Sequence, residues 1–175
     1  MQTQWKETST HPKLLDTLFG FKAKTMDIFN DVLGLHQISH IAVTQIDKDR
    51  KILVFSSTPA MEYNVFNNAL WPFDKTYNPD WFTKTIFTNW EALYQTTHFD
   101  VLYYERQIKH HLSLGFSLAI QEEDRYYVYS IAFSKDNPPD PELLVGKVDD
   151  FKKIGLYCKN LLQPYYDAAA RPSFF

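Results

Sequence analysis

The chain has little cysteine and little glycine. Its 175 residues include a single cysteine, Cys158, which excludes an intrachain disulfide and is compatible with a reducing compartment. The five glycines stand far apart, and this spacing excludes the clustered-glycine loops that bind phosphate, including the pyrophosphate loop of acetyltransferases. No Gly-x-Ser-x-Gly motif marks a serine nucleophile. The sequence therefore gives no support to the common nucleotide-binding and serine-hydrolase classes.

An excess of charge and a long apolar run are also lacking. The net charge of −3 leaves no basic footprint for nucleic acid or an anionic membrane. No apolar run approaches the roughly 18 residues of a membrane span. The first residues, 1–7, lack the basic start and apolar core of a signal peptide. We therefore expect a soluble cytoplasmic protein that forms one domain.

Aromatic residues are abundant, with 14 Phe, 11 Tyr and 4 Trp, and rings of this size dominate the packing of a core. The clearest pattern is an antiparallel hairpin over 112–133. One set of alternate positions is large and apolar, from Leu112 to Ile120 and from Tyr127 to Phe133. The intervening positions are small or semi-polar. This alternation with a period of two predicts a hairpin with one large apolar face, called the oily face below, and a second face suited to a cavity or another layer.

The remaining elements predict an α+β fold. An apolar stripe between 12 and 33 indicates a helix with a possible break near Gly20, and strands are expected at 38–46 and 51–57. A short helix should follow to about 70, then a structured loop to 89 and an interrupted helical stretch to 111. A long helix is expected over 142–163, ended or kinked by Pro164. We predict a central antiparallel sheet of about five strands flanked by N- and C-terminal helices, as in PAS-like and GAF-like domains.

Candidate catalytic and metal-binding groups do not form a convincing site. Adjacent His110 and His111 diverge on a helix or a strand. His36 and His40 have the spacing of a helical metal pair, but the expected helix ends at Gly34 and 38–46 is an expected strand. Zinc requires three or four close ligands, and Cys158 is predicted to be a buried, unreactive thiol. We therefore expect no metal, no cofactor and no catalytic residue. The enzyme hypothesis would depend on one group of titratable residues: His98, Asp100, Glu105, His110 and His111.

Aromatic residues gather between 63 and 90, in the segment expected to lie over the sheet. Indole and phenol groups combine apolar surface with one hydrogen-bonding atom, which suits a small amphiphilic ligand. Plain core packing is the alternative explanation. Asp80 or Asp74 could supply a polar anchor, or either could cap a helix. The predicted ligand-binding residues are Tyr63, Trp71, Tyr77, Asp80, Trp81 and Trp90.

The last helix carries a second pattern. Its apolar positions step alternately by four and three residues: Leu144, Val148, Phe151, Gly155, Cys158, Leu162 and Tyr165. Such a stripe can pack on the sheet or meet its copy in a homodimer, and both alternatives remain open.

Several short stretches resemble the N-terminal sensory domains of LuxR-type transcription regulators. They are 35–41, similar to the entry into that family's first strand, 55–59, similar to the following strand exit, and 151–162, similar to the helix that leads to the DNA-binding part. The resemblance covers about 14–163. We expect a flexible segment over 1–11, one PAS-like sensory domain over 12–163 and a C-terminal tail over 164–175. No helix-turn-helix follows in this sequence, so we expect no direct binding of nucleic acid by this chain.

The resemblance implies a non-enzymatic domain that binds a small, largely apolar molecule and signals through its C-terminal helix. A protein-interaction module, possibly a secreted bacterial protein, with the same fold and no ligand is the second hypothesis. That module predicts an exposed apolar patch on the last helix or around Phe174 and Phe175.

Overall fold

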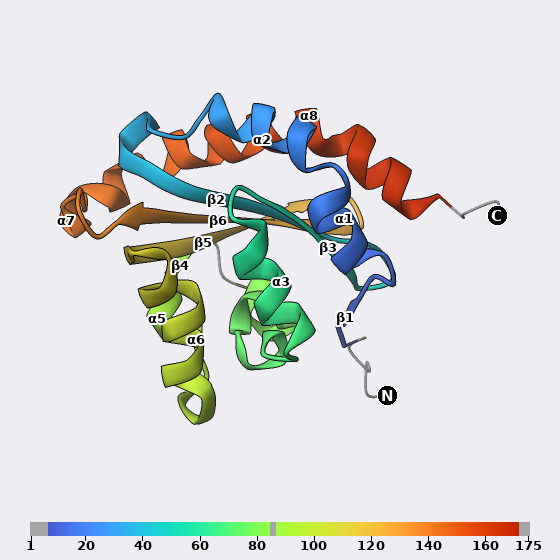
Figure 1. The fold of residues 1–175 in the computed structure, drawn as a ribbon, viewed down its shortest axis with the longest axis horizontal. Helices are drawn as coiled ribbons and strands as arrows, with labels where there is room; N and C mark the ends of the chain where they lie inside the picture. Colours follow the sequence, from blue (N-terminus) through green and yellow to red (C-terminus); the bar gives the residue numbers. More distant parts are fainter. Residues whose placement is uncertain (1–6, 85–86, 172–175) are drawn as a thin grey trace.

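The computed structural model describes residues 7–84 and 87–171, and a six-stranded sheet forms the centre of this part of the chain (Figure 1). The strand order is β1-β3-β2-β6-β5-β4. The parallel pair is β1 with β3, and the other neighbours run antiparallel. The strands are β1 (Ser9–Thr10), β2 (Ile38–Ile46), β3 (Lys51–Ser56), β4 (Phe87–Asn89), β5 (Leu112–Glu122) and β6 (Arg125–Ser134). The predicted α+β class and antiparallel centre are confirmed, and the strand number is close to the expected five.

The hairpin of β5 and β6 has the two faces that its alternation predicts. Phe116 and Phe133 pack against Phe151 of the last helix, so the oily face points toward that helix. On the opposite face, Gly115 lies against the ring of Trp90, and Ser117 and Ser130 place their hydroxyl oxygens 3.2 Å apart. The face of small side chains therefore lies under a second layer.

Helices α2 (Lys22–Asn30) and α8 (Val148–Ala170) lie over the oily face of the sheet (Figure 1). Helix α1 (Leu14–Gly20) precedes α2, and the chain breaks between them at the glycine where the sequence predicts an interruption. On α8, Phe151, Cys158 and Leu162 are fully buried, and burial raises the pKa of the Cys158 thiol to about 12. The apolar stripe of the last helix thus packs within the chain, while a homodimer stays a prediction.

The bounds of the terminal segments differ from those predicted. The expected helix 142–163 is divided into α7 (Pro141–Leu144), a 3₁₀ turn and α8, and α8 runs through Pro164 to Ala170. Pro164 and Asn160, the residue whose carbonyl cannot pair with the proline nitrogen, are both exposed, so the missing helical hydrogen bond lies on the solvent side of α8. Tyr166 is buried and donates its hydroxyl to the carbonyl of Val43. The predicted tail therefore begins inside a docked helix, and part of the predicted flexible N-terminus, Ser9–Thr10, pairs with β3.

The other face of the sheet carries a cover layer, defined here as residues 59–84 and 90–110. It consists of short helical segments (Figure 1): α3 (Pro59–Asn67), η2 (Trp71–Phe73), η3 (Lys75–Tyr77), α4 (Pro79–Phe82), α5 (Trp90–Leu93), η4 (Thr96–His98), α6 (Phe99–Arg106) and η5 (Ile108–His110). None of these helices exceeds nine residues. Such short helices are marginal alone, so tertiary contacts must hold the layer in place.

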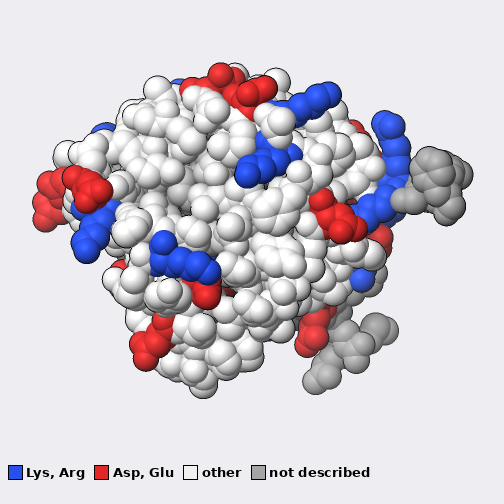
Figure 2. Space-filling view, viewed as in Figure 1, with Lys and Arg blue, Asp and Glu red and all other residues white. Residues whose placement is uncertain are grey.

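The surface shows no dominant charge on the face seen in Figure 2, where acidic and basic side chains are interspersed over a broad uncharged area. Within 7–84 and 87–171, no helix has the length and apolar character needed to cross a bilayer.

Candidate functional site

The sheet presents a row of short side chains to the cover layer. Register places five residues side by side across β3, β2, β6, β5 and β4: Ser56, Ala42, Ser130, Ser117 and Thr88. We call this set the floor row. Four of its five members carry a hydroxyl group, and no side chain in the row reaches more than one bond beyond its Cβ atom. The floor row is thus polar and low, which is unusual for the inner face of a sheet.

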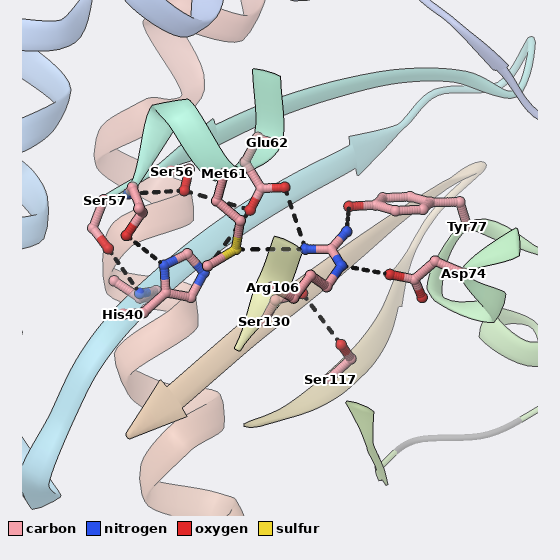
Figure 3. Close-up of polar contacts among 12 residues, drawn as sticks. His40, Ser56, Ser57, Met61, Glu62, Asp74, Tyr77, Arg106, Ser117 and Ser130 are labelled. Atoms are coloured by element: carbon pink, nitrogen blue, oxygen red, sulfur yellow. Dashed lines mark hydrogen bonds and ion pairs between the residues drawn. The ribbon is translucent and has the colours of Figure 1, made fainter. Parts of the chain in front are cut away.

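A buried ionic cluster in the cover layer lies above the floor row (Figure 3). Arg106 is 3% exposed, and its Nε lies 2.8 Å from Oδ2 of Asp74. Its two terminal nitrogens contact Oε2 of Glu62 at 3.5 Å and the hydroxyl oxygen of Tyr77 at 3.1 Å. The guanidinium also lies 5.7 Å from the centre of the Trp90 ring. One cation therefore joins α3, η3, α5 and α6.

Helical periodicity explains how these charges reach the interior. On α6, Arg106 continues the stripe of Phe99, Leu102 and Tyr103, at spacings of three and four residues that place all of them on one face. Glu62 occupies a stripe position of α3 in the same way, beside the buried Met61 and Val65. The sequence analysis missed both residues. A signal was present, because two opposite charges stand where the periodicity calls for apolar side chains.

His40 and Thr44 on β2 add two unpartnered polar atoms to this face. Each residue is 1% exposed, and neither Nε2 of His40 nor Oγ1 of Thr44 has a hydrogen-bond partner among the described residues. The other ring nitrogen of His40, Nδ1, lies 2.8 Å from Oγ1 of Thr58. Nε of Arg106, which forms an ion pair with Asp74 but no hydrogen bond, and Nε2 of His110 are unpartnered in the same way. Buried polar groups in proteins are nearly always satisfied, so these exceptions make this face a candidate place for another polar group to bind.

Burial sets the protonation of the groups around His40. Loss of solvent, and then the charge of Arg106, lowers the pKa of His40 to about 3, so the ring is neutral at physiological pH. Burial also raises the pKa of Glu62, against the opposing effect of Arg106. His40 is faced by Glu62 from α3, Arg106 from α6 and, at longer range, His110 from η5. The neutral His40 ring therefore adds no second positive charge beside Arg106.

The buried neutral histidine predicts a specific acid sensitivity. Between pH 6.5 and pH 3 the unfolded chain binds a proton at His40 that the folded chain does not. Stability should therefore fall by about 1.4 kcal/mol per pH unit as the pH drops below 6.5. His40→Asn should lose this contribution to the slope of unfolding free energy against pH, measured by urea denaturation. The same substitution at the exposed His111 should keep the wild-type slope. Equal slopes for wild type and His40→Asn would contradict the assignment.

Three of the predicted ligand-binding residues lie buried in the cover layer. Tyr77 contacts the guanidinium of Arg106 as described above. Trp90 is 2% exposed and packs edge-on against the His40 ring, with ring centres 5.7 Å apart. Trp81 is 8% exposed and donates its indole N–H to the Thr88 hydroxyl at 2.8 Å. Tyr77 and Trp90 thus meet at the ionic cluster, and Trp81 reaches the far end of the floor row.

The other three lie farther out. Tyr63 is half-buried and packs edge-on against Phe19 of α1, and Trp71 stacks on Phe66 near the surface. Asp80 is exposed in the first turn of α4, where its backbone N–H bonds to the side chain of Asn78. Its alternative, Asp74, is 2% exposed and belongs to the ionic cluster. The structure therefore brings together Tyr77, Trp90 and Asp74, and it leaves Asp80 in solvent.

The histidines of the enzyme hypothesis lie at opposite ends of α6. His98 precedes α6 and stacks on Phe73, whereas His110 and His111 follow the other end of that helix. No group of three potential metal ligands is found in the part of the chain that the structure describes.

Three solved structures are similar in fold to this chain. Escherichia coli SdiA superposes with a TM-score of 0.57 at 11% identity, over 90% of this chain and 70% of that one. The N-acylhomoserine lactone dependent LuxR family transcription factor CepR2 from Burkholderia cenocepacia gives 0.52 at 7% identity, over 83% and 95%. The chain has the fold of the LuxR-type regulators. SdiA in complex with octanoyl-rac-glycerol gives 0.53 at 13% identity, over 86% of this chain and 63% of that one.

The sequence-based resemblance to LuxR-type sensory domains is confirmed at the level of the fold. No family model and no curated protein matches the sequence. The LuxR-type fold fixes the architecture but not the residues that face the interior, which have to be interpreted from this chain alone.

Proposed function

We propose that this chain is a non-enzymatic, cytoplasmic sensory domain that binds one small, largely apolar molecule between its sheet and its cover layer. The observation that carries the proposal is the inner face of the sheet, where a floor row of short side chains lies beside the unpartnered polar atoms of His40 and Thr44. The ligands named for the structural neighbours, an N-acylhomoserine lactone and octanoyl-rac-glycerol, are amphiphiles of this kind.

The buried aromatic residues supply the apolar contacts in this proposal. Trp81 and Trp90 would contact the body of the ligand, because both approach the small side chains of the sheet. Tyr77 would line the same space from η3, while Tyr63 and Trp71 would support the layer from outside. His40 and Thr44 take the polar role for which Asp80 was considered, since Asp80 is exposed.

Signal output is proposed to pass through the sheet to α8. The strands that carry the floor row also carry, on their opposite face, the residues against which α8 packs: Phe116 on β5, and Tyr129 and Phe133 on β6. A change in the spacing of these central strands would therefore reach the last helix directly. Exposed Leu156 and Leu161 on the outer side of α8 favour the second candidate, an interaction surface for a protein partner or a second copy.

The ligand proposal is tested by adding octanoyl-rac-glycerol to the purified chain. We expect one molecule per chain in native mass spectrometry and quenching of tryptophan fluorescence. Stability should rise by about 2.7 kcal/mol when free ligand is 100 times its Kd. Ala42→Leu, which fills the floor row, should abolish binding, and Ala92→Leu at an exposed position of α5 should not.

The outcomes of this test separate a ligand site from solid packing. Overfilling a fully packed core costs about 1–3 kcal/mol, whereas filling a ligand space costs much less. Ala42→Leu that is strongly destabilised, together with no binding by the wild type, would refute the proposal.

A further inference from the structure

The corner between α3 and β2 has two polar atoms that face each other without a bond. Oε1 of Glu62 and Nε2 of His40 are 3.9 Å apart, too far for a hydrogen bond, and both side chains are 1% exposed. The Ser56 hydroxyl donates to Oε1 at 3.5 Å, which is a long hydrogen bond. Figure 3 shows both side chains turned toward this corner. A polar atom at hydrogen-bond distance from both Oε1 of Glu62 and Nε2 of His40 would connect the two groups.

The protonation of His40 restricts which chemical group can fill the corner. When Nδ1 donates to Thr58, Nε2 is an acceptor, and the corner then offers acceptors to an incoming donor. When Thr58 donates to Nδ1 instead, Nε2 carries the hydrogen and faces the Glu62 oxygen as a donor. A hydroxyl group can bind in either case: in the first it donates its one hydrogen to one of the two acceptors, and in the second it donates to Oε1 of Glu62 and accepts from Nε2. An ester group only accepts hydrogen bonds. It can pair with neither atom in the first case, and in the second it can pair with Nε2 of His40 but not with Oε1 of Glu62.

The charges nearby exclude an anion. The cluster holds one fixed cation, Arg106, and two carboxyl groups, Asp74 and Glu62, within ion-pair distance of it. The positive charge of the Arg106 guanidinium is already paired with Asp74, at 2.8 Å, the shorter of its two carboxylate contacts. A third carboxylate in this buried space would have no cation to pair with, and an unpaired buried charge is strongly unfavourable.

We propose that the ligand is an uncharged amphiphile that places a hydroxyl group between Oε1 of Glu62 and Nε2 of His40. This inference rests on the proposed function and narrows it to a class of molecule. The apolar part of the ligand would extend from this corner along Ala42 and Ser130, two short side chains of the sheet.

Three compounds with the same eight-carbon acyl chain test the proposal: octanoyl-rac-glycerol, methyl octanoate and sodium octanoate. We expect the hydroxyl-bearing glycerol ester to bind roughly tenfold or more tightly than the other two, by fluorescence titration near pH 7.5. His40→Phe keeps a ring against Trp90 and removes Nε2. This variant should reduce the preference for the glycerol ester over methyl octanoate to near unity, and His98→Phe at the start of α6 should retain it.

The outcomes test the ligand site and the ligand class separately. Octanoate binding as tightly as the glycerol ester, or equal binding of all three, would overturn the hydroxyl assignment and leave the ligand site intact. Failure of all three to bind would overturn the ligand site proposed above as well. The wild-type comparison decides the matter even where His40→Phe does not fold.

Discussion

Arg106→Met should unfold at much lower urea concentration than the wild type, with a loss of about 3–5 kcal/mol in the free energy of unfolding. Methionine retains the volume of the side chain and its contact with apolar neighbours. It removes the cation that joins α3, η3, α5 and α6, and it leaves Asp74 and Glu62 buried together without a counter-charge. Since stabilities of single domains are about 5–15 kcal/mol, this loss is a large fraction of the total.

The control is the same substitution at a partly exposed arginine. Arg125→Met removes a contact of 3.8 Å with Asp124 in which the two side chains are 42% and 60% exposed, and it should change stability by less than about 1 kcal/mol. Near-ultraviolet circular dichroism adds a local measurement, because Tyr77 and Trp90 flank the guanidinium. An Arg106→Met protein with unchanged stability and an unchanged aromatic signal would show that the cluster does not hold the cover layer.

The elements with strong periodicity were predictable from sequence. Strand β2 occupies the predicted span 38–46, and the break near Gly20 and the hairpin of β5 and β6 also lie where alternation and spacing place them. These patterns repeat over many residues, so each is supported by several independent positions. Strands β1 and β4 contain two and three residues, too few for a period of two to be visible, and they form only by pairing with an existing edge.

The candidate site was predictable only in part, because its centre consists of charges. The sequence analysis expected polar residues in turns and aromatic residues in the cover layer, and this expectation located Tyr77 and Trp90. It placed Asp80 in the site as a polar anchor, whereas the Asn78-Pro79-Asp80 sequence begins a short helix and turns the carboxylate to solvent. His40, Glu62 and Arg106 come from three different elements, β2, α3 and α6, and only the tertiary fold brings them together.

Gly155→Leu should separate the contribution of α8 from that of the rest of the fold. A Cβ atom at this position would lie 2.2 Å from Cδ2 and 2.3 Å from Cγ of Tyr129, a buried ring on β6. The ring cannot move away, because it is fixed within the packed layer between β6 and α8. We therefore expect a loss of about 3 kcal/mol or more, despite the better helix propensity of leucine.

Gly20→Leu is the matched control, since a Cβ at Gly20 meets no atom within 4 Å, and this substitution should leave stability unchanged or slightly higher. The two variants also test the proposed route of signal output. If α8 senses the sheet through the Tyr129 contact, Gly155→Leu should lower the protection of the α8 amides in hydrogen exchange before that of β2. Uniform loss of protection over the whole domain would indicate that α8 and the sheet unfold as one unit, and it would contradict an independent response of the last helix.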